Sequence, residues 1–520
     1  MASPSEKLAE SLEALYELQD RGFVAIRSVD LSRTHRERLS KNGFLREVMK
    51  GWYIPSDPEE QRGESTGWHA SFWSFCSAYL EERFGEDWCL SPEQSLFLHA
   101  GNRSVPQQLL VRAPKGGNKP TNLPHNTSLM DVKLDLPEEQ YREQCNKLRI
   151  YTLPASLVFT GPGLFGKNST DARAALAMIQ DASEMLAILL DGGHSRIAGR
   201  LAGAFRNIGR DKIANEIVDT MKKVGYDVRE NDPFEEQAPF AVGTREPSPY
   251  VTRVKLMWHA MREEIIDVFP EAPKKKTNVN AYMKHVEGIY ATDAYHSLSI
   301  EGYRVNAELI ERVRSGAWNP DNEEEDRKEL NALAARGYHE AFEAVTQSVR
   351  KVLDGENSGE VADNDHSTWY RELFAPGVNA GIVKAADLAG YRNGPVFIRQ
   401  SMHVPPSHEA VRDMMPLLFE LLREETDPAV RIVLGHFVFV YIHPYIDGNG
   451  RMGRFLMNVM LASGGYPWTI IPVEKRNDYM RSLEAASVHQ DIKPFTEFLA
   501  TLVKDNMEGK PGPKVPAGRQ

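Results

Sequence analysis

The sequence has little cysteine and no long apolar run. Three cysteines, Cys76, Cys89 and Cys145, stand far apart in 520 residues, without a Cys-x-x-Cys pair. This excludes a disulfide scaffold and a cysteine-based zinc site, and it favours a reducing compartment. The most apolar stretch, residues 429–442, contains an arginine and a histidine and is too short to span a bilayer. The first residues lack the apolar core of a signal peptide. We therefore expect a cytoplasmic chain with no membrane partner.

The chain also has fewer basic than acidic residues. The chain has 62 Lys and Arg residues against 73 Asp and Glu residues, a net charge of −11. A chain this acidic is not a general nucleic-acid coat, although a small basic face could still contact DNA. Internal repeats are absent as well, which argues against a solenoid or a propeller. The composition, 41% hydrophobic and 26% charged, is that of a globular protein.

The texture of the sequence divides the chain into four regions. Residues 1–58 combine a helical apolar stripe, a short basic helix and two strands, an order typical of a small winged helix-turn-helix. Residues 59–240 mix short β-like runs with helices, so we expect an α+β region. Helical periodicity dominates residues 241–505. Residues 506–520 are rich in Gly and Pro and are expected to form a flexible tail.

A basic helix is expected between Ser32, a suitable N-cap, and Gly43, a suitable residue after the last turn. In a recognition helix, cationic side chains reach phosphates and base edges. The candidates here are Arg33, Arg36, Arg38 and Lys41. The alternative is a solvated face on a small protein-docking domain. The stretch resembles the winged-helix start of abortive-infection-type antitoxins and related bacterial regulators, and this resemblance implies DNA as a partner.

The segment of residues 430–467 combines two apolar helices with a polar loop. A proline ends the first helix directly after His443. The loop Gly448-Asn449-Gly450 then leads into the second helix, whose N-terminal N–H groups are suited to bind an anion. Arg451 and Arg454, three residues apart, add positive charge on one face of that helix. The sequence therefore predicts a phosphate site at this loop.

Two further side chains at this loop are suited to catalysis. Asp447 is its one carboxylate and is placed to hold a magnesium ion on phosphate oxygens. His443 can take a proton from an attacking hydroxyl near neutral pH. Together these groups predict transfer of a phosphorus centre from a nucleotide to a hydroxyl. A calcium loop is excluded, because positions six and twelve counted from Asp447 are Met452 and Asn458. A purely structural helix–loop–helix explains any one of these residues, but not the set.

The run from His443 to Arg454 resembles the signature of Fic-domain proteins, H-P-F-x-D/E-G-N-G-R-x-x-R. The matching residues are His443, Asp447, Gly448, Asn449, Gly450, Arg451 and Arg454, with Met452 and Gly453 at the variable positions and Tyr445 in place of Phe. The likeness spans residues 250–503. It implies an all-helical core that mostly transfers AMP from ATP to a Ser, Thr or Tyr hydroxyl of a target protein.

The resemblance also implies a role for each residue. His443 would deprotonate the target hydroxyl, and Asp447 would bind Mg²⁺. Asn449 and the loop N–H groups would hold the α-phosphate. Arg451 would bind the α- and β-phosphates, and Arg454 would bind the γ-phosphate.

Residues 394–406 resemble the flap of that family, a β-hairpin whose edge pairs with a segment of the target by β-augmentation. Its strand residues next to the nucleotide site would be Val396, Phe397, Ile398 and Arg399. An ordinary hairpin is the alternative. Tyr479 stands where the family often places an aromatic ring against adenine, although the preference for a base stays open.

A regulatory motif is expected upstream. Ser297, Glu301 and Gly302 resemble the inhibitory motif of the family, [S/T]xxxE[G/N]. By this resemblance the Glu301 carboxylate would pair with Arg454 and occupy the place of the γ-phosphate. The alternative is a surface glutamate before a capping glycine. In some relatives the same glutamate supports removal of AMP, so hydrolysis stays open.

The sequence thus predicts a mainly α chain that acts as an autoinhibited protein adenylyltransferase. Its expected partners are ATP, a target protein docked at the flap, and a second copy of itself as a homodimer. One alternative is a DNA-binding regulator or antitoxin-like protein whose Fic domain senses nucleotide. The presence of a base, His443, argues against a pure sensor. Another alternative is a Fic enzyme that uses a different nucleotide or removes AMP.

Overall fold

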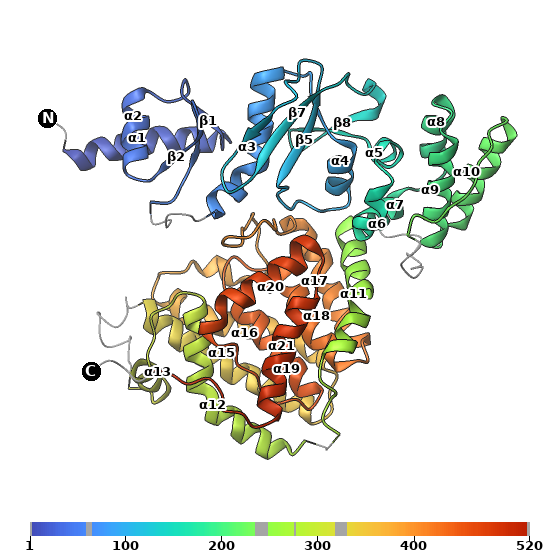
Figure 1. Ribbon diagram of the computed structural model, residues 1–520. Coiled ribbons are helices and arrows are strands. Elements are labelled where there is room, and N and C mark those ends of the chain that lie inside the picture. The colour runs from blue at the N-terminus through green and yellow to red at the C-terminus, as the bar shows by residue number, and fades with distance from the viewer. Residues whose placement is uncertain (1–2, 59–64, 235–247, 275–276, 318–329, 517–520) are drawn as a thin grey trace. The chain divides into compact units, whose positions relative to one another are not determined.

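The computed structural model describes residues 3–58, 65–234, 248–274, 277–317 and 330–516. Most of this part of the chain is helical, so the expected mainly α fold is confirmed (Figure 1). The chain forms two compact units. The first comprises Met1–Leu256 and Phe397–Val404, and the second comprises Met257–Val396 and Pro405–Gln520. The expected divisions after residues 58 and 240 border on ranges outside the described residues, so the division into four regions stays a prediction.

The first unit begins with two helices and a small sheet. Their bounds are α1 (Pro4–Asp20), β1 (Ile26–Arg27), α2 (Arg33–Lys41), β2 (Leu45–Met49) and β3 (Trp52–Pro55). The strands pair antiparallel in the order β1-β3-β2. The Ser32 hydroxyl caps α2 by accepting a hydrogen bond from the His35 N–H, and Gly43 follows α2 with φ +80°. The expected helix, basic helix and β-ribbon are present, whereas their assignment as a winged helix stays a prediction.

A mixed α+β region completes the first unit, as expected. Its four-stranded sheet has the order β4-β5-β7-β6, in which β5 and β7 run parallel and the other pairs run antiparallel. A two-stranded ribbon, β8-β9, follows. The strands are β4 (Cys89–Leu90), β5 (Gln108–Ala113), β6 (Pro120–Asn122), β7 (Ser128–Lys133), β8 (Arg142–Cys145) and β9 (Leu148–Tyr151). The helices are α3 (Thr66–Phe84), α4 (Pro92–His99), α5 (Leu153–Phe159), α6 (Gly163–Lys167), α7 (Ser169–Met178), α8 (Ser183–Asp191), α9 (Ser195–Asn207) and α10 (Asp211–Lys223).

The segment Phe397–Val404, distant in sequence, also belongs to the first unit. The Val105 N–H donates to the Met402 carbonyl oxygen at 2.9 Å. The Gln400 N–H donates to the Thr66 hydroxyl at 3.0 Å. Met402 and Val404 pack against an apolar core of this unit. The prediction of a β-hairpin over residues 394–406 is therefore wrong: these residues form turns and loop, because their backbone groups bond elsewhere.

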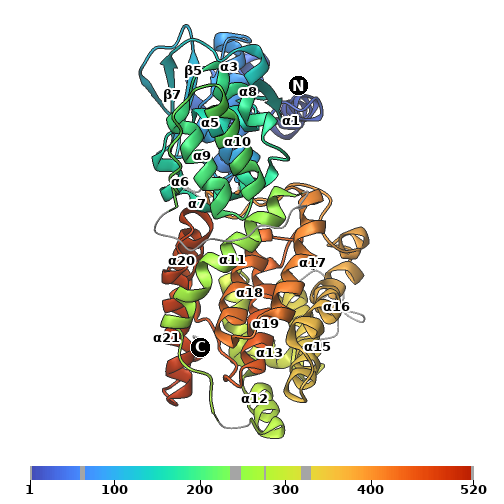
Figure 2. The same ribbon diagram turned by 90° about the vertical axis from the view of Figure 1, so that its right-hand side faces the viewer.

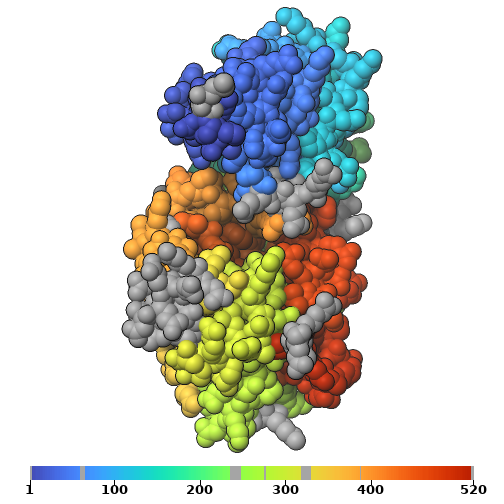
Figure 3. Space-filling model, turned by 90° about the vertical axis from the view of Figure 1, so that its left-hand side faces the viewer, coloured from blue at the N-terminus to red at the C-terminus, as the bar shows by residue number. Residues whose placement is uncertain are grey.

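The second unit is a bundle of helices. They are α12 (Val279–Ile300), α13 (Ala307–Arg314), α15 (Leu330–Leu353), α16 (Ser358–Asn379), α17 (His408–Glu424), α18 (Pro428–Ile442), α19 (Asn449–Ser463), α20 (Arg476–His489) and α21 (Lys493–Met507), with α11 (Pro249–Val268) leading into it. Helix α19 contacts α12, α15, α16 and α18, so it forms the centre of the bundle (Figures 1 and 2). On the face drawn in Figure 3, yellow-green α12 and the red C-terminal helices lie at the surface of this unit.

In the part of the chain that the structure describes, no helix is both long enough and apolar enough to cross a bilayer.

Candidate active site

The side chain of His443 lies at the C-terminal end of α18. This helix starts at an N-cap, Asp427, whose carboxylate accepts hydrogen bonds from the first backbone N–H groups, and nearly all of its residues are buried. His443 ends it in the left-handed conformation, with φ 53° and ψ 61°. Its Nδ1 lies 3.2 Å from the Val440 carbonyl oxygen, which can only accept, so Nδ1 carries the proton and Nε2 is an acceptor. Burial lowers the pKa of His443 to about 4. At neutral pH the ring is therefore an unprotonated base.

The loop after His443 is held by its own amide side chain. Asn449 accepts a hydrogen bond from the Tyr445 N–H and donates one to the Tyr445 carbonyl oxygen, both at 2.9 Å. The Tyr445 ring is buried and stacks on Tyr370 at 3.8 Å between centroids. Gly448 has φ +80°, and a Cβ there would meet the Phe374 ring at 2.7 Å. The Asn449 amide thus shapes the loop, and its expected contact with a phosphate stays a prediction.

Arg451 is buried, with 1% of its side chain exposed. Its guanidinium lies between two aromatic rings, Tyr303 at 5.2 Å and Phe374 at 5.0 Å. One nitrogen, Nη2, lies 3.3 Å from the Asp447 carboxylate. Its Nε has no hydrogen-bond partner among the described residues. A buried donor without a partner is uncommon, and this one is available to a further acceptor.

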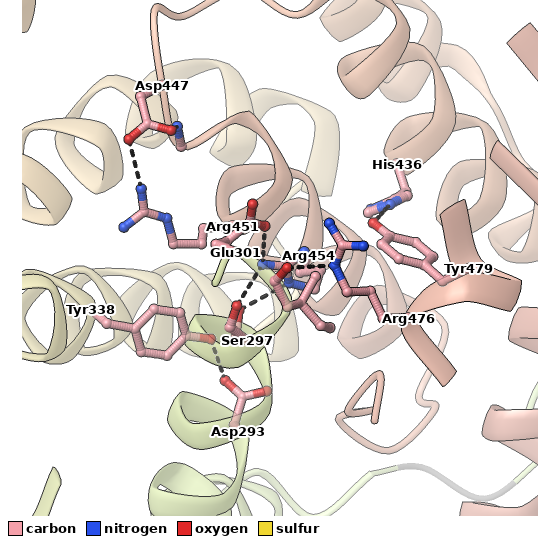
Figure 4. Close-up of polar contacts among 12 residues, drawn as sticks. Asp293, Ser297, Glu301, Tyr338, His436, Asp447, Arg451, Arg454, Arg476 and Tyr479 are labelled. Carbon is pink, nitrogen blue, oxygen red and sulfur yellow. Dashed lines mark hydrogen bonds and ion pairs between the residues drawn. The ribbon is translucent and has the colours of Figure 1, made fainter. Parts of the chain in front are cut away.

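The side chain of Arg454 is hydrogen-bonded to the C-terminal part of α12 (Figure 4). Its Nε donates to the Ser297 hydroxyl at 2.9 Å, and its Nη2 donates to the Ser297 carbonyl oxygen at 3.0 Å. The same Nη2 pairs with the Glu301 carboxylate at 2.6 Å. Although burial acts against the charged form, the Glu301 charge raises the pKa of Arg454 above its usual value. Burial likewise acts against the charge on Glu301, but Arg454 and Arg451 hold the pKa of this carboxyl below its usual value. Both groups are therefore charged at neutral pH.

The end of α12 fixes the place of Glu301. Gly302 has φ +94°, its N–H donates to the Ser299 carbonyl oxygen, and the Tyr303 N–H donates to that of Leu298. This pattern is a Schellman motif, which ends a helix at a glycine. On the opposite side, a Cβ at Gly450 would lie 2.4 Å from the Glu301 carboxylate oxygen. The contact between Glu301 and Arg454 therefore requires a glycine at position 302, which ends the helix, and at position 450, where a side chain would collide with the carboxylate.

Tyr479, at the start of α20, is 1% exposed. Its hydroxyl lies 2.7 Å from Nε2 of His436 in α18, and its ring stacks on Phe498. Burial raises the pKa of Tyr479 to about 12, so the hydroxyl is neutral. Its expected contact with adenine stays a prediction.

Among the described residues no group of three or more His, Cys, Asp or Glu side chains could hold an ion. A magnesium ion on a nucleotide needs only one or two protein carboxylates, since phosphates and water supply the rest. The Asp447 side chain, 65% exposed beside Arg451, fits that need. Its role as a ligand stays a prediction.

Other predicted residues lie elsewhere. Val396 is in the second unit, whereas Phe397, Ile398 and Arg399 are in the first, so their expected contact with nucleotide and target stays a prediction.

The four basic residues of α2 differ among themselves. Arg33 pairs with Glu37 at 2.7 Å, and both side chains are exposed. Arg36 donates to the Ser28 carbonyl oxygen, and Arg38 donates to the Lys7 carbonyl oxygen at 2.5 Å. Lys41 is exposed. Three of the four residues expected to contact DNA therefore have a partner within this part of the first unit.

Sequence reasoning did not identify Asp293. This buried carboxylate accepts a hydrogen bond from the Tyr338 hydroxyl at 2.6 Å (Figure 4). It accepts a second one from Trp468 Nε1 at 3.1 Å. Asp293 lies four residues before Ser297 and eight before Glu301, on the same face of α12. That spacing was the available signal.

Comparisons with known proteins add an independent finding. Residues 367–461 match the family model described as the Fic/DOC family. A curated relative, the protein adenylyltransferase Fic of Nematostella vectensis, is 30% identical over 241 residues, which are 45% of this chain and 50% of the relative. The protein of the same name from Drosophila yakuba is 27% identical over 238 residues, 45% of this chain and 43% of the relative. The chain thus spans half or less of the length of these two curated relatives.

A solved structure, Fic-1 (residues 134–508) from C. elegans, superposes with a TM-score of 0.37 at 18% identity. This match covers 66% of this chain and 96% of that one. The matched family segment, residues 367–461, contains His443, the glycine loop and both arginines, and it is similar to the Fic/DOC family.

Proposed function

We propose that the second unit transfers AMP from ATP to a Ser, Thr or Tyr hydroxyl of a target protein, and that Glu301 restrains this activity. The observation that carries the proposal is the 2.6 Å pair between Glu301 and Arg454, beside a histidine base and a glycine loop at a helix N-terminus. The match of residues 367–461 to the Fic/DOC family and the curated relatives named protein adenylyltransferase support it.

The triphosphate would bind where positive charge and free N–H groups meet. Helix α19 begins at Asn449, with Gly448 as its N-cap, and its N-terminus presents backbone N–H groups and a positive dipole end to an anion. Arg451 adds a fixed cation with an unused Nε donor. Arg454 adds a second cation one helical turn further along. This series of positive groups suits a chain of phosphates.

In the transfer step, Nε2 of His443 takes the proton of the target hydroxyl. The hydroxyl oxygen forms a bond to the α-phosphorus while the bond from that phosphorus to the bridging oxygen of the β-phosphate breaks. The electron pair of the broken bond leaves with pyrophosphate, and AMP stays on the target as a phosphodiester. Mg²⁺ held at Asp447 would neutralise part of the pyrophosphate charge. The neutral ring at pH 7, a consequence of burial, makes His443 a competent base.

Glu301 would restrain this step through Arg454. Its carboxylate occupies the Nη2 of Arg454 that a terminal phosphate would need. A phosphate beside Glu301 would also meet a like charge, which costs free energy in a partly buried site. ATP would then bind with its α-phosphate out of line for attack. Since some Fic relatives use the same glutamate for AMP removal, the test includes that reaction.

The test uses the full chain with Mg²⁺ and ATP labelled at the α-phosphate. We expect Glu301→Gly to incorporate label into the protein itself or into lysate proteins at least about tenfold faster than the wild type, a change of about 1.4 kcal/mol in the barrier. Two controls match it: Glu301→Gly/His443→Ala, which lacks the base, and Glu287→Gly, which removes an exposed glutamate of the same helix. Labelled protein is then chased with unlabelled wild type to detect AMP removal.

Equal labelling by the wild type and Glu301→Gly would show that Glu301 does not restrain the activity. Labelling that survives His443→Ala would show that His443 is not the base. If labelled GTP, CTP or UTP is a better donor than ATP, the transferred nucleotide is not AMP, but the proposed transfer reaction is still supported. No transfer with any nucleotide would favour a nucleotide-sensing regulator, and salt-dependent binding to duplex DNA would then be measured.

A further inference from the structure

Arg392 is a buried arginine whose partners, in the part of the chain that the structure describes, are backbone carbonyl oxygens. Only 2% of the surface of this residue is exposed. Nε donates to the carbonyl oxygen of His443 at 2.8 Å, Nη1 to that of Gly394 at 2.9 Å, and Nη2 to that of Pro406 at 2.5 Å. A longer contact, 3.4 Å, joins Nη2 to the Ile442 carbonyl oxygen.

These partners fall into two groups. His443 and Ile442 are the end of α18, which carries the base. Gly394 and Pro406 are the two ends of the segment of residues 394–406, whose middle part belongs to the first unit. The Arg392 backbone makes the same link, because its N–H donates to the Pro444 carbonyl oxygen at 2.9 Å. One side chain and one N–H therefore join both ends of that segment to the backbone around His443.

The guanidinium group suits this task for physical reasons. A buried cation without a carboxylate is costly, and here burial lowers the pKa of Arg392 to about 10. The carbonyl oxygens at the C-terminus of α18 offset that cost, because a helix end carries partial negative charge. The planar fork directs several donors along fixed, different directions, whereas a lysine has one ammonium at the end of a flexible stem.

The link also concerns the conformation of His443. A residue other than glycine in the left-handed region costs about 1 kcal/mol or more. His443 adopts φ 53°, and hydrogen bonds from Arg392 hold its carbonyl oxygen and that of the next residue. Without them, nothing else described in this loop bonds the His443 carbonyl oxygen in place, since the Asn449 amide bonds to Tyr445.

We propose that Arg392 is a positioning residue that ties the two ends of the segment of residues 394–406 to the backbone of His443, and so fixes the position of the base. The inference rests on the proposed function for the role of His443 as the base. Arg392 itself touches neither nucleotide nor target.

The experiment places Arg392→Lys and Arg392→Met in the full-length Glu301→Gly chain. Turnover should fall by about 100-fold in Arg392→Met, because a shift of about 1 Å in the reacting groups costs that much. The dissociation constant for ATP, measured by calorimetry, should change less than twofold, since the phosphate site is intact. Arg392→Lys should recover only a minor part of the turnover, because it restores the charge without the fork.

A matched control is Arg431→Met. Arg431 lies near the other end of α18, where it donates to the Glu425 carbonyl oxygen at 2.6 Å and to the Ser463 hydroxyl at 3.3 Å. Its loss removes a similar set of hydrogen bonds from the same helix, and turnover should stay within about threefold of the parent. Equal losses in Arg392→Met and Arg431→Met, or a parallel loss of ATP binding, would show that Arg392 only supports the fold and would overturn the proposal.

A second readout keeps the inference separate from the proposed function. Amide hydrogen exchange is measured over peptides covering residues 392–404 and 440–448. Faster exchange of both peptides in Arg392→Met, and of neither in Arg431→Met, is expected. Unchanged exchange would overturn the proposal. If the parent Glu301→Gly chain transfers nothing, the proposed function fails, and the exchange experiment alone decides whether Arg392 forms this link.

Discussion

Two helices of the molecule carry arginines in their first two turns, and the two sets differ in the exposure of these side chains. In α2 of the first unit, Arg33 forms an ion pair in which both side chains are largely exposed, 84% and 65%. In α19 of the second unit, Arg451 and Arg454 are 1% and 5% exposed. Each of these buried arginines contacts several groups, including rings, a hydroxyl and carboxylates.

The difference shows why basic residues near a helix start are ambiguous in a sequence. Exposed ion pairs contribute little, because water and salt screen them. Buried arginines, in contrast, require partners that other segments supply. The sequence predicts a role for both sets, but only the buried set lies in the site that we propose to bind phosphates. Three experiments sharpen this contrast.

The largest effect is expected from acid. Burial lowers the pKa of both His436 and His443 to about 4, against about 6.5 in an unfolded chain. As the pH falls from about 6.5 to about 4, the unfolded chain binds protons first, so folding stability decreases, by about 3 kcal/mol for each histidine at the lower limit. The stability is fully present above pH 6.5.

The measurement is the free energy of unfolding by urea between pH 7 and pH 4. His436→Gln keeps a polar partner for Tyr479 and removes one titrating group, so its pH dependence should be shallower than that of the wild type. Identical slopes for both proteins would show that His436 titrates normally.

A smaller effect is expected from Arg454→Leu. It leaves Glu301, whose side chain is 27% exposed, without its strongest partner, and we expect a loss of about 2 kcal/mol, less than for a fully buried pair. Adding Glu301→Gln should restore part of it, as a double-mutant cycle would record. Arg33→Ala in α2 is the comparison and should leave the unfolding free energy unchanged. A comparable loss in both variants would contradict the contrast drawn here.

The smallest effect is expected within α2 itself. Arg38 donates to the Lys7 carbonyl oxygen and to the Ser11 hydroxyl at 2.7 Å, so it joins α2 to α1. Arg38→Ala should cost about 1 kcal/mol, whereas Lys41→Ala should cost nothing measurable by thermal unfolding. If only Lys41→Ala then weakened binding to a DNA duplex, the exposed face of α2 would be the nucleic-acid contact. Equal stability of both variants would show that the link to α1 is unimportant.

The parts of the site that could be predicted are those carried by consecutive residues or by a short motif. The run from His443 to Arg454 is continuous, so the spacing alone places a base, a glycine loop and two cations together. The resemblance of Ser297, Glu301 and Gly302 to an inhibitory motif, not their spacing, leads to the expected pairing of Glu301 with Arg454. The ion pair between these two side chains in the structure agrees with that expectation.

The parts that could not be predicted come from separate segments. Tyr303 and Phe374 enclose Arg451 from two different elements, and no local pattern marks either ring. Asp293 meets Tyr338 only because α12 packs against α15. Arg392 precedes the expected hairpin by two residues, yet its partners at Ile442 and His443 are about 50 residues away.

The prediction of a hairpin over residues 394–406 failed for a related reason. Alternating apolar residues such as Val396 and Ile398 are typical of strands, but a strand also needs a neighbour for its backbone groups. Here Gln400 bonds to Thr66, and Met402 bonds to Val105. Partners that lie about 300 residues away in the sequence took the place of the expected cross-strand bonds.

The chain changes from one unit to the other three times, after Leu256, after Val396 and after Val404. A single recombination breakpoint therefore cannot exchange either unit as a complete module. A gene fragment that starts at Met257 would still encode Met402 and Val404, which complete the core of a unit that the fragment lacks. Such a fragment would expose apolar side chains in the middle of its own sequence. Expression of residues 257–520 alone would therefore leave Met402 and Val404 without the core against which they pack.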